Sequence, residues 1–161
     1  MTIFVFTLIS VAVIALDQLS KAAASAWLKP ITSFHLWDGV FHLTYVENRG
    51  AAFGILKDQR WVFILLSIVA MLVIAAYVIL KRKELHPLLL IALSFLFGGG
   101  IGNMIDRVAY GYVVDFLDFT LIDFAVFNVA DTFVCVGAGL LILYILLHES
   151  DASKKSDGKG H

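Results

Sequence analysis

An Asn-x-x-Asp pattern that occurs twice marks the residues best suited to chemistry in this chain. Asn103 and Asp106 form the first copy, with Arg107 directly after it, and Asn128 and Asp131 form the second. On a helix, residues three apart lie on the same face, so each copy places an amide beside a carboxylate. The sequence therefore predicts at least two carboxylates that each have an amide neighbour.

More carboxylates lie between the two copies, within and after the apolar segment Tyr112–Phe119. Asp115 and Asp118 belong to this segment, which we expect to form a loop, and Asp123 follows it. Two carboxylates that lie close together in a poorly solvated place cannot both ionise, so they share one proton. One of them can then act as a base towards water while the other acts as an acid towards a carbonyl. Such a pair favours hydrolysis without a covalent intermediate.

Asp131 is the strongest candidate for one member of the pair, because it is the only charged residue between Phe124 and Leu147. The spacing leaves its partner open among four acids: Asp106, Asp115, Asp118 and Asp123. A carboxylate that is held by a guanidinium is a poor partner for a shared proton. We therefore expect Asp106 and Arg107 to form a structural ion pair.

The other three candidate partners differ in how apolar their surroundings are. Asp118 and Asp123 resemble ordinary loop acids near lipid headgroups, where a solvated or structural role is usual. Asp115 follows two valines and precedes Phe116, so it has the most apolar local sequence and is best suited to a raised pKa. These surroundings favour Asp115 as the partner of Asp131.

Motifs for other kinds of catalysis are absent from the sequence. It contains no His-Glu-x-x-His, no Gly-x-Ser-x-Gly and no Walker loop. The single cysteine, Cys135, excludes an intrachain disulfide and a cysteine-based zinc site. The five histidines lack metal-ligand spacing and are expected in loops: His35, His42, His86, His148 and His161. We therefore expect neither a metal nor a cofactor.

The composition requires a membrane environment. Of the 161 residues, 60% are hydrophobic and 16% are charged, and the mean hydropathy is +0.90. Soluble domains average about 45–50% apolar and about 25% charged residues. This difference excludes a water-soluble globule, a disordered chain and a nucleic-acid binder. The formal net charge of -1 also gives no field that would attract nucleic acid.

Four apolar windows are long enough to cross a bilayer, for which about 20 residues are needed. They are Ile3–Trp27, Trp61–Leu80, Pro87–Ile105 and Phe124–Leu147. The chain is therefore expected to form an all-α integral membrane protein with one four-helix transmembrane domain, residues 1–147. The remaining residues, 148–161, are rich in Ser, Asp, Gly and Lys and are expected to form a disordered cytoplasmic tail.

The first window is less apolar than the others because it contains Asp17 and Lys21. These residues share a helix face and can form an ion pair that lowers the cost of insertion, or support a site, and both roles stay open. Ala24–Ala26 resembles the cleavage site of a signal peptide. However, only Met1–Thr2 precedes the apolar run, without the positive segment of such peptides. A retained first helix is therefore favoured.

Basic residues indicate how the helices are oriented, because short loops rich in Lys and Arg stay in the cytoplasm. Lys81–Lys83 lie between the second and third windows, and three more lysines lie in the tail. Both termini are therefore predicted to be cytoplasmic, with residues 28–60 and 106–123 outside. The two Asn-x-x-Asp copies then lie at the same depth, near the outer face.

The first outer segment has the composition of a small β element. Phe41–Val46 alternates in the manner of a short strand or hairpin. The segment is too short for a domain of its own, so we expect it to lie on the membrane surface against the helix ends.

Five segments together resemble the bacterial lipoprotein signal peptidases, the signal peptidase II family. They are Leu16–Lys21, Val46–Gly54, Gly102–Arg107, Val113–Phe116 and Phe127–Asp131, in the order of that family. The resemblance implies an aspartic protease of the bacterial cytoplasmic membrane, with four transmembrane helices, a small extracytoplasmic β element and a short outer helix. Such enzymes cut the signal peptide from prolipoproteins just before a lipid-modified cysteine.

The resemblance also implies roles for individual residues. The catalytic pair would be Asp115 and Asp131, which agrees with the argument from apolar surroundings. Six further residues match family positions that bind substrate or shape the site: Asp17, Asn48, Asn103, Asp106, Arg107 and Asn128. The expected partners are diacylglyceryl-modified prolipoproteins and membrane lipids. We expect a monomer, because nothing in the sequence indicates a dimer face.

Two segments could act on a substrate. Gly98–Gly100 would let a substrate helix approach closely, or would pack the third and fourth spans together. Asn48–Phe53, with the flexible Gly50, would close over the site.

Two other functions compete with a peptidase. Membrane carboxylates also relay protons in transporters, although four spans are few for one chain and the acids here lie at one level. In a non-catalytic scaffold, the same acids would join helices. Substituting Asp115 or Asp131 by Asn separates these functions, because an enzyme would lose turnover while it stays folded.

Overall fold

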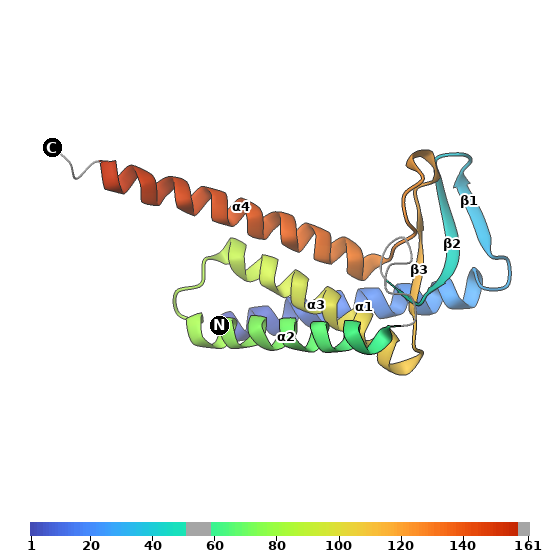
Figure 1. Ribbon diagram of the computed structural model, residues 1–161, viewed down its shortest axis with the longest axis horizontal. Helices are drawn as coiled ribbons and strands as arrows, with labels where there is room; N and C mark the ends of the chain where they lie inside the picture. Colours follow the sequence, from blue (N-terminus) through green and yellow to red (C-terminus); the bar gives the residue numbers. More distant parts are fainter. Residues whose placement is uncertain (51–58, 158–161) are drawn as a thin grey trace.

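The structure, a computed structural model, describes residues 1–50 and 59–157, with side chains as far as His148 (Figure 1). Four long helices lie within these residues: α1 (Thr2–Trp27), α2 (Arg60–Lys81), α3 (Pro87–Ala109) and α4 (Val129–Asp157). Each has a segment long and apolar enough to cross a membrane. The four predicted spans are therefore confirmed.

The helix α4 differs from its predicted span at both ends. It begins at Val129, later than predicted, because the segment before it pairs with a strand described below. It then continues to Asp157, past the predicted end at Leu147. The helix thus includes residues 148–157 of the segment that the sequence assigns to the tail. Residues 158–161 lie outside the described residues.

The helix α3 is central and contacts the other three helices. It begins at Pro87, whose fixed φ suits the first position of a helix. The His86 ring caps this end by accepting a hydrogen bond from the backbone N–H of Leu88, at 3.2 Å. The local sequence thus sets where the third span starts.

The three consecutive glycines of α3 each face a different helix. A Cβ added at Gly98 would lie 2.8 Å from the Cβ of Val13 on α1. One at Gly99 would lie 2.6 Å from the backbone oxygen of Ala130 on α4, and the third glycine faces Met71 of α2. The glycines therefore serve helix packing within the bundle, and the alternative, close approach of a substrate helix, is not supported.

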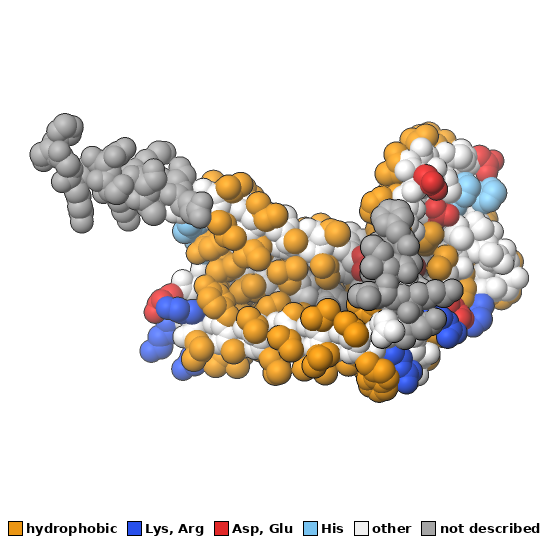
Figure 2. Space-filling view, in the orientation of Figure 1, with side chains coloured by type: hydrophobic (Ala, Val, Ile, Leu, Met, Phe, Trp, Pro, Cys, Tyr) orange, Lys and Arg blue, Asp and Glu red, His pale blue; other side chains and the backbone are white. Residues whose placement is uncertain are grey.

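Apolar side chains cover the outer faces of the helices, while charged side chains gather towards the two ends of the bundle (Figure 2). Leu16, Leu66 and Leu80 are each more than half exposed. A continuous apolar surface of this kind is unfavourable in water but matches the hydrocarbon of a bilayer. The helices thus have the surface expected of membrane spans.

A three-stranded antiparallel sheet lies at one end of the bundle, in the order β1-β2-β3 (Figure 1). Its strands are β1 (Ser33–Trp37), β2 (Phe41–Asn48) and β3 (Val113–Asp118). The first two form the predicted hairpin. The third corrects a prediction, because the segment expected to be a loop pairs with β2 through its apolar, β-branched residues.

The strand β3 is fixed on three sides. One edge pairs with β2, and on the other edge Leu117 bridges to Phe127, just before α4. Its side chains Val114 and Phe116 pack with residues at the C-terminal end of α1. Beyond β3, a 3-10 turn, η2 (Thr120–Ile122), is the one short helix outside the spans in the described part of the chain.

Two histidines lie on strands instead of in loops. His35 on β1 and His42 on β2 are directly opposite each other in the hairpin. The prediction of loop histidines is therefore wrong for this pair. His42 lies within Phe41–Val46, the predicted strand, and His35 lies on β1, which precedes that alternating pattern.

Candidate active site

Asp115 and Asp131 line the same cavity, of about 560 Å³, where β2 and β3 meet α3 and α4. Of the four acids that the sequence offers as partners of Asp131, Asp115 is the one on this cavity. Asp118 instead accepts a hydrogen bond from the Thr44 hydroxyl at 2.7 Å, and Asp123 is exposed. The structure therefore brings together the two acids that the sequence favours.

Asp115 is buried on β3 and is held by two side-chain amides. Asn48 donates to its Oδ2 at 2.8 Å, and Asn128 donates to its Oδ1 at 2.7 Å. Burial raises the pKa of Asp115 to about 7, and the negative charge of Asp131 adds to this rise, while the two amide hydrogen bonds oppose it. Asp115 therefore gains and loses its proton near neutral pH, and the raised pKa agrees with the sequence argument.

Asp131 lies in the first turn of α4, where it forms a reciprocal cap with Asn128. The backbone N–H of Asn128 donates to Asp131 Oδ2 at 3.2 Å, and the backbone N–H of Asp131 donates to Asn128 Oδ1 at 2.9 Å. This is the geometry of a capping box, in which each side chain satisfies a free N–H of the helix end. In the second Asn-x-x-Asp copy, the spacing therefore places the two residues in a helix cap, because Asn128 directly precedes Val129, the first residue of α4.

The side chains of Asn103 and Asn128 join the two aspartates. Asn103 donates to Asp131 Oδ1 at 2.7 Å, and Asn128, which already contacts Asp115, donates to Asn103 Oδ1 at 3.0 Å. All four carboxylate oxygens of the pair thus accept a hydrogen bond from an amide. The ion pairs among the described residues include neither aspartate.

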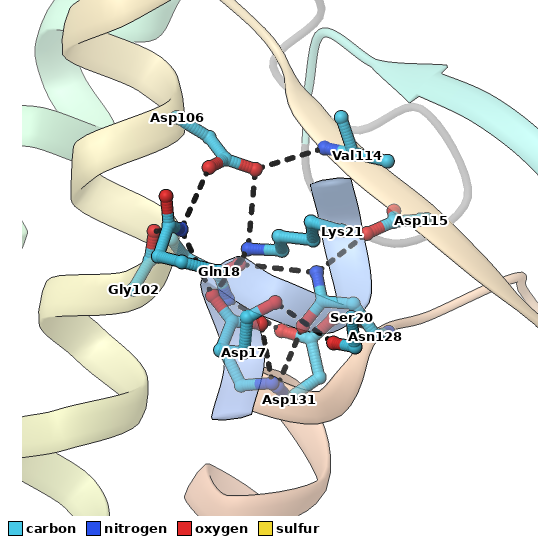
Figure 3. A network of polar contacts seen from close by, with 12 residues as sticks. Asp17, Gln18, Ser20, Lys21, Gly102, Asp106, Val114, Asp115, Asn128 and Asp131 are labelled. Carbon is cyan, nitrogen blue, oxygen red and sulfur yellow. Dashed lines mark hydrogen bonds and ion pairs between the residues drawn. The ribbon is translucent and has the colours of Figure 1, made fainter. Parts of the chain in front are cut away.

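A second group of buried charges lies beside the pair, and we call it the lysine cluster: Asp17, Gln18, Lys21 and Asp106. Lys21 Nζ lies 2.9 Å from Asp17 Oδ2 and 3.1 Å from Asp106 Oδ2. Gln18 donates to Asp106 Oδ1 at 3.0 Å. Figure 3 shows Lys21 pointing between the two acids, with Asp115, Asn128 and Asp131 close by. The predicted ion pair of Asp17 and Lys21 is therefore confirmed.

The lysine cluster also reaches the aspartate pair. Lys21 donates to Asn103 Oδ1 at 2.9 Å, and the other end of that amide donates to Asp131. Asp17 Oδ1 accepts from the backbone N–H of Ala130 at 2.9 Å, and so contacts the first turn of α4. The cluster thus supplies a cation to two buried carboxylates and also contacts groups that touch Asp131. Both roles that the sequence leaves open, an ion pair and support of a site, are compatible with these contacts.

The predicted ion pair of Asp106 and Arg107 is wrong. In the described part of the chain Asp106 pairs with Lys21 and not with Arg107. Adjacent residues on a helix point in different directions, so they do not face each other. Arg107 lies on the cavity instead, where it donates to the backbone oxygens of Asn103 and Gly50, each at 3.4 Å. Its guanidinium lies 4.8 Å from the centre of the Phe63 ring.

The predicted site residues therefore fall into two layers. Three amides contact the aspartates directly: Asn48, Asn103 and Asn128. Asp17 and Asp106 lie one step away in the lysine cluster. Gln18 and Lys21 were not predicted as site residues, although a Gln and a Lys within an apolar window gave a signal. The predicted closure by Asn48–Phe53 falls largely on residues 51–53, which lie outside the described residues.

These features together define a class: a multi-pass membrane protein whose paired acids share one cavity. A pair with one proton near neutral pH can supply both an acid and a base, which is what hydrolysis by water requires. Residues 9–147 match the family described as Signal peptidase (SPase) II. The chain belongs to this family, and the predicted resemblance is therefore confirmed.

Curated relatives and solved structures agree with this assignment. The chain is 43% identical over 145 residues to the lipoprotein signal peptidase of Clostridioides difficile (strain 630), covering 90% of this chain and 97% of that one. It is 46% identical over 142 residues to the lipoprotein signal peptidase of Brevibacillus brevis, covering 88% and 95%. A solved bacterial membrane enzyme superposes with a TM-score of 0.80 at 32% identity, covering 92% of each chain.

Family membership makes the chain a protease of the bacterial inner membrane that processes prolipoproteins. The transporter and the scaffold are accordingly not favoured.

Proposed function

We propose that the chain is an aspartic endopeptidase in which Asp115 and Asp131 activate one water molecule to cut the prolipoprotein signal peptide before its lipid-modified cysteine. The observation that carries the proposal is the shared cavity, together with Asn128 beside it, whose side-chain amide donates to Asp115 and whose backbone N–H donates to Asp131. No cation in the described residues holds either of them in the ionised form by an ion pair. A proton can therefore be exchanged between them during a reaction.

The two aspartates differ in a way that suits different roles. Asp115 carries a proton near neutral pH because burial raises its pKa. Asp131 accepts a hydrogen bond from Asn103, whose oxygen in turn accepts one from the Lys21 ammonium, so a positive charge lies one amide away from this carboxylate. We therefore assign Asp115 as the initial acid and Asp131 as the initial base.

The reaction then needs two steps. Asp131 takes a proton from water while the water oxygen bonds to the scissile carbonyl carbon and Asp115 protonates the carbonyl oxygen. In the second step Asp131 returns its proton to the leaving nitrogen as the carbon–nitrogen bond breaks, and Asp115 recovers a proton from a hydroxyl of the tetrahedral intermediate. Both aspartates end in their initial states, and no covalent enzyme intermediate forms.

The cavity wall suits a substrate that is anchored by lipid. Beside the aspartates, the cavity is lined by apolar side chains: Phe63, Val113, Phe124, Val126, Phe127 and Val136. Diacylglyceryl chains can remain against such a wall and the bilayer while the peptide bond reaches the carboxylates. Contact with membrane lipids is part of this proposal.

The orientation follows from charge. Lys81 and the two basic residues after it lie at the turn between α2 and α3, at the end of the bundle opposite the sheet. The positive-inside rule assigns that end to the cytoplasm. We therefore propose that both termini are cytoplasmic and that the site lies near the outer face. Because one chain supplies every group of the site, we propose a monomer.

The test is cleavage of a diacylglyceryl-modified prolipoprotein by the purified wild type and by the variants Asp115→Asn and Asp131→Asn. Loss of an acid or base should lower the rate by about 10²–10⁴-fold, while the melting temperature shows that each variant is folded. Asp123→Asn is the matched control, since Asp123 is exposed and its φ of 49° is one that Asn also tolerates.

The control should cleave at the wild-type rate. Near-normal cleavage by a folded Asp115→Asn or Asp131→Asn variant would show that the pair is wrongly assigned.

A further inference from the structure

The β1–β2 hairpin brings two histidines and one acid together on its exposed surface, away from the aspartate pair. His35 and His42 are directly opposite residues of the two strands. Their rings stack with centroids 4.0 Å apart and an interplanar angle of 11°. Side chains of directly opposite residues lie on the same face of a sheet, so both rings face the same side.

The turn between the strands adds a carboxylate to the two rings. His35 Nδ1 lies 2.9 Å from Asp38 Oδ1. Gly39 has a φ of 70°, a value that glycine adopts without strain, and its backbone N–H donates to His42 Nε2 at 3.3 Å. An Nε2 that accepts a hydrogen bond has an unprotonated lone pair. His42 Nε2 is therefore unprotonated, and a metal bound at this nitrogen would replace the hydrogen bond from Gly39.

We propose that His35, Asp38 and His42 form a site for a divalent transition metal, with Zn²⁺ as the ion that fits it. One ligand atom from each residue lies within 4.8 Å of the others. Zinc–nitrogen bonds are about 2.0–2.1 Å long, so the ligands must close slightly around the ion. Because these side chains are exposed or half-exposed, small rotations suffice, and water can occupy the remaining position.

The donor set selects the kind of metal. Two imidazole nitrogens and one carboxylate oxygen suit Zn²⁺ and its neighbours Co²⁺, Ni²⁺ and Cu²⁺. Mg²⁺ and Ca²⁺ require mainly oxygen ligands, and Cu⁺ prefers sulfur. The neighbouring strand adds negative charge, because Asp118 on β3 is directly opposite His42.

The spacing of the histidines in the sequence predicts no metal site, and the structure gives the reason for this difference. The ligand atoms come from two strands and a turn, so they meet through the strand register of the hairpin. Motifs with fixed spacing do not describe such a site. A metal at this position would tie β1, the turn and β2 together at the edge of the sheet.

Metal titration of the full chain tests the proposal. The protein is purified in detergent without a polyhistidine tag, treated with chelator, and titrated with Zn²⁺ by calorimetry and with Co²⁺ by visible absorption. We expect saturable binding of one equivalent. His42→Gln should raise the dissociation constant more than about tenfold, since loss of groups that merely support a ligand already costs about 10–100-fold.

Two control variants separate this site from others on the chain. His148→Gln makes the same change at an exposed histidine outside the hairpin, and it should bind as the wild type does. Asp115→Asn should also bind normally, which separates the hairpin from the aspartate pair and this proposal from the proposed function.

A variant of the exposed Asp38 provides a second measurement in case a histidine variant fails to fold. Asp38→Asn should weaken Zn²⁺ binding in a protein whose melting temperature without metal equals that of the wild type. The proposal is overturned if the wild type shows no saturable binding, if folded Asp38→Asn and His42→Gln variants bind as tightly as the wild type, or if His148→Gln removes the binding.

Discussion

Two groups of buried acids lie side by side at the sheet end of the bundle, and they differ in what faces them. In the lysine cluster, Asp17 and Asp106 both pair with the Lys21 ammonium, at 2.9 and 3.1 Å. In the aspartate pair, Asp115 and Asp131 accept hydrogen bonds from amides and line a cavity of about 560 Å³. In the first group one ammonium pairs with both carboxylates, whereas the second group has no cation in an ion pair and leaves a proton to be shared.

The difference shows that neighbouring acids in one small bundle can have different roles, one group stabilising the fold and the other suited to proton transfer. In the lysine cluster each carboxylate is held in an ion pair by the same ammonium, so neither is a good partner for a shared proton. An amide can donate to either form of a carboxyl group, and it leaves the proton free to move. Asn103 stands between the two groups, with its oxygen on Lys21 and its nitrogen on Asp131. Asn103 thus connects Lys21 to Asp131 through two hydrogen bonds, so the lysine contacts the aspartate pair only indirectly.

The largest effect is expected from Lys21→Met, which breaks the lysine cluster. Two buried carboxylates would lose their cation, and removal of one partner from a buried ion pair costs about 3–5 kcal/mol of the free energy of unfolding. Asp115→Asn should cost less, because it replaces a carboxyl group whose pKa is raised to about 7 and leaves no charge unpaired. Melting temperatures in detergent give the comparison. A Lys21→Met protein as stable as the wild type would contradict the structural role of the cluster.

The second largest loss of stability is expected from Gly102→Ala, which tests how tightly the residues around the lysine cluster are packed. A Cβ there would lie 2.5 Å from Asp17 Oδ2. Gly102→Ala should therefore force the acid away from its partners and cost about 1–3 kcal/mol, as overpacking usually does. The measurement is thermal unfolding together with the cleavage rate.

Gly139→Ala is the matched control on α4, since a Cβ there meets nothing within 4 Å. It should leave stability unchanged or raise it slightly through higher helix propensity. Equal melting temperatures for the two variants would show that the lysine cluster can accommodate an additional methyl group at position 102 without loss of stability.

Much of this comparison could be predicted from the sequence, and the successful part depends on local properties. The four spans follow from apolar length, and the pair Asp115 and Asp131 follows from the apolar residues around each acid. The ion pair of Asp17 and Lys21 follows from helix spacing. Each of these features is set by residues near one another in the chain.

The part that could not be predicted depends on partners far apart in the chain. Asp106 has Arg107 next to it in the sequence but pairs with Lys21, which comes from another helix. The sequence predicts a loop at β3, because the partner strand β2 lies many residues earlier in the chain. Strand register and helix contacts decide these pairings, and a single sequence does not encode them as a local pattern.

The pH dependence offers a smaller, reversible way to separate the two groups. Because the pKa of Asp115 is raised to about 7, its protonated fraction falls about tenfold for each pH unit above that value. The cleavage rate should therefore fall about tenfold between pH 8 and pH 9. A rate that stays constant over this range would mean that Asp115 need not be protonated.

Stability should change in a different pH window. A carboxyl group whose pKa is raised on folding binds its proton more tightly in the folded state, so its contribution is full below the ordinary pKa of about 3.9. This contribution is lost as the pH rises towards 7. Asp115→Asn should remove that slope from a plot of melting temperature against pH, while Asp123→Asn should keep it.

The smallest effect is expected at an ion pair outside the spans, between Lys29 and Glu47, which lie 3.0 Å apart. The hydrogen bond from Lys29 lowers the pKa of Glu47, so any stability it adds is present above the ordinary carboxyl pKa and is lost as the pH falls through the lowered value. Water screens this exposed pair, so Glu47→Gln should leave the melting temperature at neutral pH unchanged within error. A clear drop would show that the pair is shielded from water, as the lysine cluster is. The Lys29–Glu47 pair and the Lys21 pairs have nearly equal distances between their charged atoms. We therefore expect burial, and not distance, to explain why only the Lys21 pairs contribute to stability.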